Sequence, residues 1–242
     1  MRISKLVKSL LPDSAVEHIR RRRREKRLAI INNLSSNEEV FSAIYEHRMW
    51  GGAGTDFYSG HGSHDRDFVE PYLTAVSTFL ASLDPKPVVV DLGCGDFSVG
   101  SNLVLYASKY IACDVVPNLV ERNRKVYADL PVEFRHLDMV ASDLPRGDVA
   151  ILREVLQHLN NAGVKAVAEK LPAFRYVIVT EQLPKGDFTP NIDKPTGYDV
   201  RMNHRSGVDL CAAPFSLKPA EAKVLFEFDM GSTIARTTLY RM

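Results

Sequence analysis

The sequence predicts an α/β fold with a seven-stranded, mostly parallel sheet, a C-terminal antiparallel hairpin and helices on both faces. Three observations support it. Short apolar and β-branched runs alternate with helix-length segments over residues 87–181, which is typical of parallel strands covered on both faces. The first run leads directly into a turn containing Gly93 and Gly95. Two further strand-like runs, 222–229 and 233–241, are separated by a short glycine-containing turn, which predicts a hairpin.

The individual elements follow from the same alternation of patterns. Apolar runs of strand length and amphipathic segments of helix length can be told apart by their period. Strands are expected near residues 87–92, 109–114, 132–137, 148–153 and 175–181, followed by the two hairpin strands. Helices are expected near 98–107, 117–128 and 155–170, with a weaker one between 65 and 82.

The turn after the first strand has the composition of a nucleotide-binding loop. Gly93 and Gly95 allow a tight turn and leave room for a ligand next to the backbone, ahead of a segment whose N–H groups point at the ligand. Asp114 ends the next strand, 19 positions after Gly95. An acid at about this distance accepts hydrogen bonds from ribose hydroxyls. Together these features predict an adenosine-containing ligand.

The same turn distinguishes between two adenosine-containing cofactors. A dinucleotide-binding loop has a third glycine that lets the helix pack over a pyrophosphate, whereas this chain has Ser98 there. Asp91 would repel a pyrophosphate and attract the ammonium group of an amino acid. The residues therefore favour S-adenosylmethionine over NAD.

The segment Val89-Val90-Asp91-Leu92-Gly93-Cys94-Gly95 resembles motif I of the class I S-adenosylmethionine-dependent methyltransferases. Residues 134–139, 148–154 and 176–181 resemble the third, fourth and fifth strands of that family, and the resemblance covers residues 86–242. It implies a Rossmann-like sheet with an antiparallel last strand and a methyltransferase activity. It also implies an acid and an apolar residue near the adenine, at Asp138 and Met139.

The candidate cofactor contacts lie at the carboxyl ends of the strands and in the glycine-rich segment before them. Ligands of open α/β sheets bind outside the strand ends where the strand order reverses, which places Glu181 on the same rim as well. A loop in the segment before the first strand is expected either to close over the cofactor or to be a linker whose tryptophan plugs the core edge. The predicted contacts are Trp50, Ser63, Asp91, Gly93, Cys94, Gly95, Asp114, Val115, Asp138, Met139 and Arg153.

Candidate catalytic residues lie at the exit of the fourth strand. Glu154 and His158 are four residues apart and would share one face of a helix that had begun there. His158 is expected to accept a proton from an acceptor hydroxyl, with Glu154 orienting it; the alternative is a capping glutamate and a histidine bonded to backbone. His204 is the second candidate base, in the long segment 182–218. No metal site is predicted.

The long segment 182–218 also bears on the acceptor, because loops of this length in compact domains are commonly functional. Its hydrogen-bonding side chains suit a sugar or another polyhydroxylated molecule, or form a surface flap without a ligand. We therefore expect O-methylation of a saccharide or small polar acceptor. The alternatives are N-methylation, and an inactive cofactor-binding partner subunit or membrane-surface adaptor. The side chains concerned are those of Asn191, Asp193, Arg201, Asn203, His204 and Arg205.

Charge is distributed unevenly along the chain. The total is +1, but residues 1–30 hold ten basic and three acidic residues and the remainder is negative. The run Arg20–Arg24, with Lys26 and Arg27, is either a solvated helix or a site for an anionic surface such as lipid head groups or a charged glycan. Nucleic acid is disfavoured because no aromatic residues interleave the arginines.

Three segments are expected in the chain: a basic N-terminal helical extension (1–48), a glycine-rich lid with a lead-in helix (49–85), and a cofactor-binding domain (86–242). The three cysteines have no paired spacing, which favours reduced thiols in a cytoplasmic protein. Attachment to the membrane periphery through the basic run is the alternative for its location.

Overall fold

A computed structural model describes residues 13–52, 54 and 56–242. The first twelve residues of the predicted basic extension, and Ala53 and Thr55 of the predicted lid, lie outside the described residues.

The α-helices are α2 (Asp13–Ile31), α3 (Asn37–Glu46), α4 (Arg66–Ala81), α5 (Pro117–Val126) and α6 (Asn161–Ala168). The strands are β1 (Val88–Leu92), β2 (Lys109–Asp114), β3 (Val132–His136), β4 (Val149–Arg153), β5 (Tyr176–Pro184), β6 (Glu221–Asp229) and β7 (Thr233–Arg241). Short 3-10 helices are η1 (His61–Ser63), η2 (Gly100–Asn102), η3 (Val104–Tyr106), η4 (Leu156–His158), η5 (Leu171–Ala173) and η6 (Arg201–His204).

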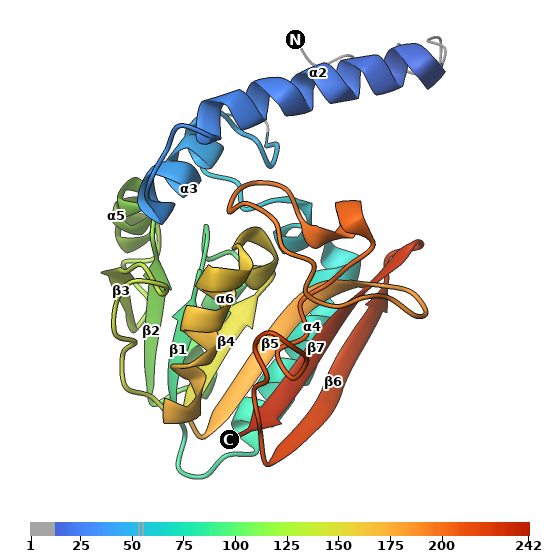
Figure 1. The fold of residues 1–242 in the computed structure, drawn as a ribbon. Helices are drawn as coiled ribbons and strands as arrows, with labels where there is room; N and C mark the ends of the chain where they lie inside the picture. Colours follow the sequence, from blue (N-terminus) through green and yellow to red (C-terminus); the bar gives the residue numbers. More distant parts are fainter. Residues whose placement is uncertain (1–12, 53, 55) are drawn as a thin grey trace.

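The strands form one seven-stranded sheet in the order β3-β2-β1-β4-β5-β7-β6. Strands β1 to β5 run parallel to one another, and β7 is antiparallel to both β5 and β6 (Figure 1). This confirms the predicted fold class, including the hairpin. The strand order reverses between β1 and β4, so the ends of these two strands meet at the crevice where open α/β sheets bind ligands.

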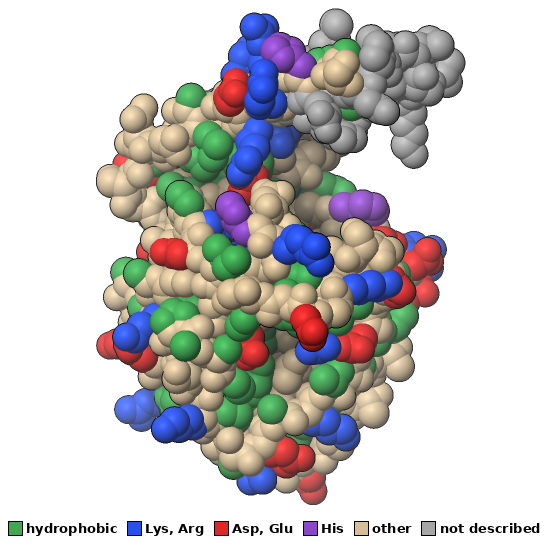
Figure 2. All heavy atoms as spheres, turned by 45° about the vertical axis from the view of Figure 1, so that its right-hand side comes forward, with side chains coloured by type: hydrophobic (Ala, Val, Ile, Leu, Met, Phe, Trp, Pro, Cys, Tyr) green, Lys and Arg blue, Asp and Glu red, His purple; other side chains and the backbone are tan. Residues whose placement is uncertain are grey.

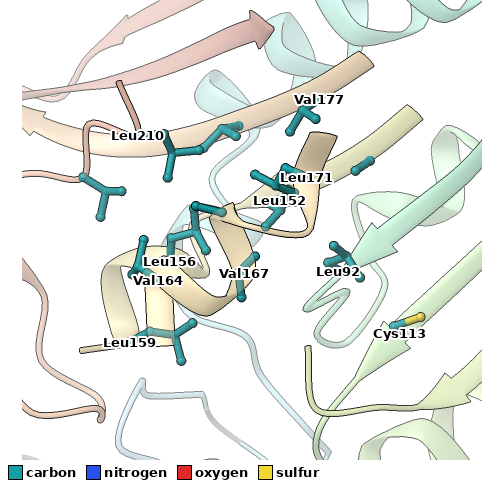
Figure 3. Packing of buried hydrophobic residues seen from close by; sticks show 14 of the residues in the cluster. Leu92, Cys113, Leu152, Leu156, Leu159, Val164, Val167, Leu171, Val177 and Leu210 are labelled. Atoms are coloured by element: carbon teal, nitrogen blue, oxygen red, sulfur yellow. The ribbon is translucent and has the colours of Figure 1, made fainter. Parts of the chain in front are cut away.

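Helices cover both faces of the sheet, because successive side chains of each buried strand point to opposite faces. On one face Val90, Ala150 and Val177 belong to a buried cluster with α6, and on the other Val89 and Ile178 belong to a buried cluster with α4. Figure 3 shows α6 and the turn before it closing over Leu152 and Val177. Such continuous burial accounts for the unbroken apolar strands seen in the sequence.

The prediction of an α-helix over residues 98–107 is wrong. The structure has two 3-10 helices there, η2 and η3. Ser101 Oγ donates to the Ser98 carbonyl, and Asn102 Nδ2 donates to the carbonyls of Ser98 and Val99. Such side-chain bonds compete with the helical ladder. Together with Gly100 they account for the loss of a regular α-helix.

The helix predicted over 155–170 is also shorter than expected. Residues 156–158 form a 3-10 turn, and α6 begins only at Asn161, where Asn160 caps the helix by accepting from Gly163 N at 2.7 Å. Asparagine is among the strongest helix-starting residues. Glu154 and His158 therefore do not share a helix face, and the predicted orienting role of Glu154 has no helical basis.

Two helices precede the sheet domain. Ser36 and Glu39 form a capping box at the start of α3, which contacts α2 and α5 and lines the pocket beyond the strand ends. In contrast, α2 lies across the top of the molecule (Figure 1), where Arg24 is paired with Asp199 and Arg27 lies over the Tyr198 ring. Lys and Arg side chains run along it in the space-filling view (Figure 2). None of the helices among the described residues has the length and apolar character needed to span a bilayer.

Candidate functional site

The glycine turn lies between the ends of β1 and β2. Gly93 N and Cys94 N both donate to the Cys113 carbonyl of β2, at 2.8 and 3.0 Å. Gly93 and Gly95 have φ values of 77° and 58°, which residues with a Cβ rarely adopt. A Cβ on Gly93 would also lie 2.5 Å from Val155 Cγ2. The turn therefore requires glycine for its conformation and for the close approach of the β4 exit.

Asp114 ends β2 with its carboxylate beneath this turn. Its Oδ2 accepts from Gly95 N at 2.9 Å and its Oδ1 from Val116 N at 3.1 Å. Burial raises the pKa of Asp114, while the backbone N–H groups act in the opposite direction. Because each carboxylate oxygen can accept two hydrogen bonds, Asp114 retains acceptor capacity toward a pair of ligand hydroxyls.

Asp91 lies deeper, on β1. The Tyr110 hydroxyl donates to its Oδ2 at 3.0 Å, and burial raises the pKa of Asp91 to about 7. A cation bound nearby would favour the ionised form of this carboxyl. Asp91 is thus suited to a positively charged group entering the pocket.

The end of β3 supplies a second acidic group. Asp138 accepts two hydrogen bonds from Asn37 Nδ2, at 3.1 and 3.0 Å, and one from Val140 N at 2.8 Å. Lys170 Nζ donates to three backbone carbonyls of the loop after β3, those of Met139, Val140 and Ser142. The loop that carries Asp138 and Met139 is therefore fixed from both sides.

The glycine-rich lead-in segment is bonded directly to the glycine turn. Ser59 N donates to Asp96 Oδ2 at 2.9 Å, and Asp96 N donates to Ser59 Oγ at 2.7 Å. Tyr45 of α3 and His64 join this pair, through Ser59 Oγ and Asp96 Oδ2 respectively. Burial would raise the pKa of Asp96, but bonds from Ser98, Ser59 and His64 outweigh it and lower the pKa. The lead-in segment therefore forms one wall of the site and is held to the glycine turn by side-chain and backbone hydrogen bonds.

Arg153, at the end of β4, faces the same wall. Its Nη2 donates to the Gly62 carbonyl at 2.7 Å and its Nη1 to Ser63 Oγ at 3.3 Å. The guanidinium lies over the rings of Phe68 and Tyr72, 4.8 and 4.9 Å from their centroids. With five N–H donors on an arginine, donor capacity is left for an anionic ligand group.

Glu154 follows Arg153 in a left-handed backbone conformation, with φ of 53°. Its Oε1 accepts from Gln182 Nε2 at 3.0 Å, and its Oε2 lies 3.6 Å from Arg153 Nη1. A non-glycine residue in this region is strained and is often found at functional sites. The conformation turns the chain from β4 into η4 and brings His158 to the pocket wall.

His158 packs against the only tryptophan of the chain, with 4.9 Å between the ring centroids of His158 and Trp50. Its Nδ1 is buried without a hydrogen-bond partner among the described residues. Burial, followed by the charge of Lys194, lowers the pKa of His158 to about 3. The imidazole is therefore neutral at physiological pH.

A single pocket of about 980 Å³, including its open mouth, collects these groups. All eleven predicted cofactor contacts line it, as do Glu154 and His158. His204 does not line it; this residue is exposed on η6. Glu181 does not reach the rim either, because its carboxylate accepts from the N–H groups of Leu156 and Gln157 beneath the η4 turn.

Of the six polar residues predicted to face an acceptor from segment 182–218, Asn191, Asp193 and Arg201 bind other parts of the chain, and Asn203, His204 and Arg205 are exposed. Asn191 bonds to the backbone of Asp209 and Ala213, and Arg201 to the β4 exit. Sequence reasoning also missed pocket residues contributed by α3, α4 and the lead-in segment. A capping box before an amphipathic helix marks α3 in the sequence, but no local signal places it over the glycine turn. The missed residues of these three elements are Asn37, Phe41, Tyr45, Ser59 and Tyr72, and Asp96 of the glycine turn was missed as well.

Comparison with known proteins agrees with this geometry. Residues 90–171 match a family model described as a methyltransferase domain. No protein with a curated description matches the chain in sequence.

Three solved structures illustrate the similarity in fold. The N-methyltransferase NodS from Bradyrhizobium japonicum WM9, in complex with S-adenosyl-L-homocysteine, has a TM-score of 0.56 at 11% identity, covering 81% of this chain and 97% of that chain. Human N-acetylserotonin methyltransferase in complex with SAM has a TM-score of 0.53 at 17% identity, covering 89% of this chain and 61% of that chain. Magnesium protoporphyrin IX methyltransferase from Synechocystis PCC 6803 with bound SAM has a TM-score of 0.52 at 14% identity, covering 86% and 99%.

Proposed function

We propose that the protein is an S-adenosylmethionine-dependent methyltransferase that methylates an oxygen atom of a saccharide or small polar acceptor, since residues 90–171 match a family model described as a methyltransferase domain. The observation that carries this proposal is one pocket in which the glycine turn, Asp114 and Asp138 meet Glu154 and His158. The first three suit a nucleoside, and the last two lie where a second substrate can approach.

The residues of the pocket fit S-adenosylmethionine group by group. Asp114 has acceptor capacity for the two ribose hydroxyls, and Asp138 and Met139 offer an acid and an apolar contact for the adenine. Asp91 suits the ammonium group of the amino acid, and Arg153 its carboxylate, since oppositely charged groups attract strongly where water is scarce. When bound, this cofactor supplies a methyl group on a cationic sulfur.

The protein's part in such a transfer is mainly alignment. A hydroxyl acceptor must also lose its proton, and His158 is the candidate to accept the hydrogen bond of that hydroxyl. Trp50, packed on His158, offers an aromatic face of the kind that apolar faces of sugars contact. The low pKa of His158 keeps a second positive charge away from a cationic methyl donor.

N-methylation is the second candidate within the enzymes. The carboxylate of Glu154, at the same pocket wall, favours it because a carboxylate attracts a cationic amine acceptor. Release of S-adenosylhomocysteine with amine-bearing acceptors but not with hydroxyl-only acceptors would decide for this alternative. A partner subunit or membrane-surface adaptor without turnover would bind S-adenosylmethionine but would release no S-adenosylhomocysteine with any acceptor.

The proposal predicts which cofactor binds. S-adenosylmethionine and S-adenosylhomocysteine should bind with dissociation constants in the low micromolar range or below, about −8 kcal/mol. NAD should not bind, because Ser98 stands where a pyrophosphate needs glycine and Asp91 repels phosphate. Isothermal titration calorimetry with the three compounds measures this. Tight binding of NAD without heat from S-adenosylmethionine would contradict the assignment.

We also propose that α2 associates with an anionic membrane or glycan surface. Its exposed basic residues include Arg21, Arg22, Arg24 and Lys26, and each basic residue near an anionic membrane contributes about 1 kcal/mol.

Deleting residues 1–27 should therefore abolish sedimentation with phosphatidylglycerol vesicles and leave cofactor binding intact. High salt should release the full-length protein, since exposed charges are screened. Equal sedimentation of the two proteins at low salt would leave α2 as a solvated helix.

A further inference from the structure

A strap formed by residues 191–201 lies against the turn that leaves β4, residues 156–161. The carbonyl of His158 accepts two hydrogen bonds from this strap, from Gly197 N at 2.9 Å and from Lys194 Nζ at 3.1 Å. The side chain of Lys194 is buried although it carries an amino group. A buried lysine needs strong partners, and its hydrogen-bond partner here is the backbone of a pocket residue.

Arg201 holds the same turn further along. The residue is 1% exposed, and its guanidinium donates to the carbonyls of Leu156 at 3.2 Å, Gln157 at 3.3 Å and Leu159 at 2.9 Å. From below, Glu181 accepts from the N–H groups of Leu156 and Gln157. The turn is thus held through both its carbonyl and its amide groups.

The side chain fixed by these contacts is the imidazole of His158. It packs on Trp50 and lines the pocket. Strap bonds to the His158 carbonyl fix its backbone, and the Trp50 ring limits the positions of the side chain. The backbone of His158 is therefore placed by strap residues that do not line the pocket, and its side chain by Trp50, which does.

The two cations next to His158 both lower its pKa. Burial lowers its pKa most, and Lys194 and then Arg201 lower it further, while backbone groups of Gly197 and Asp199 raise it. Lys194 has a pKa lowered by burial to about 8, so it is still charged at every pH at which a histidine titrates. The carboxyls of Asp193 and Asp199 partly offset the two cations, whereas burial raises the pKa of Glu181 to about 8, so this carboxyl is neutral below that pH.

We propose that Lys194 and Arg201 are positioning residues that hold His158 against Trp50 and keep its imidazole neutral in the pocket. The proposal rests on the proposed function, in which His158 meets the acceptor beside a cationic methyl donor. A neutral imidazole can accept a hydrogen bond there and does not repel the donor.

Trp50 makes this testable without an acceptor or a cofactor. A protonated imidazole in contact with an indole quenches its fluorescence, so emission should stay constant for the wild type from pH 8 to pH 4. Lys194→Gln keeps a hydrogen-bond donor for the His158 carbonyl and removes the charge. It should show a quenching transition whose midpoint is raised by about one unit or more, as expected when a neighbouring like charge is removed.

Three variants complete the design. Lys194→Arg keeps the charge and should show no transition in this range. Lys165→Met, at an exposed position of α6, should behave as the wild type. His158→Gln combined with Lys194→Gln should lose the transition, which assigns it to His158. If Lys194→Gln lacks the native near-ultraviolet circular dichroism, Lys194→Met replaces it with the same expectation.

A folded Lys194→Gln protein whose Trp50 emission is unchanged down to pH 4 would overturn the proposal. Calorimetry with S-adenosylhomocysteine on the same wild-type sample keeps the two proposals apart. Absence of binding there counts against the proposed function, whereas the tryptophan titration reports on the strap alone.

Discussion

Replacing His158 by alanine is expected to lower the rate of methyl transfer about 100-fold or more, the usual contribution of a positioned proton acceptor. The affinity for S-adenosylhomocysteine should change little, because the expected ribose and amino-acid contacts are Asp114, Asp91 and Arg153. Turnover is measured by release of S-adenosylhomocysteine with a hydroxyl acceptor that supports the wild-type reaction.

The pH dependence adds a second readout for His158. A histidine with an ordinary pKa would lose activity as the pH falls through about 6.5, where it becomes protonated. The pKa of His158 is about 3, so it is neutral at any higher pH, and the wild-type rate should not fall on this account between pH 8 and pH 5.

His204→Ala is the matched control for His158→Ala. This residue is exposed and lies outside the pocket, so its replacement should leave turnover near the wild-type value. Near-normal turnover in His158→Ala together with an inactive His204→Ala would move the catalytic role to segment 182–218.

Replacing Asp114 by alanine is expected to weaken S-adenosylhomocysteine binding by about 1.5 to 3 kcal/mol, roughly 10- to 150-fold, the range for hydrogen bonds to a charged group. The variant loses the carboxylate that faces the pocket and also leaves Gly95 N and Val116 N without their acceptor. Calorimetry at constant pH measures the change.

Asp114→Asn separates these two effects. Its amide oxygen can still accept from one of the two backbone N–H groups but cannot accept from both ribose hydroxyls as a carboxylate does. It should therefore also bind weakly. A dissociation constant unchanged in both variants would show that the ribose lies elsewhere in the pocket.

The strands could be predicted closely because each carries its own signal. Lys109–Asp114 is a strand at the predicted bounds, and Val132–His136 ends one residue before the predicted end. β-branched and apolar residues buried on both faces give a run that no surface helix shows. The acids and glycines of the site follow directly from these runs, since they stand at strand ends.

The helices next to the site could not be predicted in the same way. Over 98–107 the apolar spacing suits a helix, but Ser101 and Asn102 bond to nearby carbonyls instead. At the β4 exit Glu154 has a left-handed conformation. Its surroundings impose this conformation, and the residue types of the segment do not indicate it. Tertiary contacts determine the conformation of such segments, and the local sequence pattern alone does not reveal those contacts.

The wall of the pocket contributed by α3 and the lead-in segment was predicted only in part. Trp50 and Ser63 could be named because they stand among glycines. The reciprocal pair of Ser59 and Asp96 joins residues 37 positions apart, a pairing that a single sequence does not reveal.

The position of β7 has a consequence for the order in which the chain folds. β7 lies between β5 and β6 and pairs with both, so β6 has no neighbour in the sheet until the segment that follows it in the chain is in place. A hairpin forms within microseconds, whereas pairing with β5 must close a longer loop. The two last strands should therefore join as a preformed unit on a β5 edge that is exposed until then.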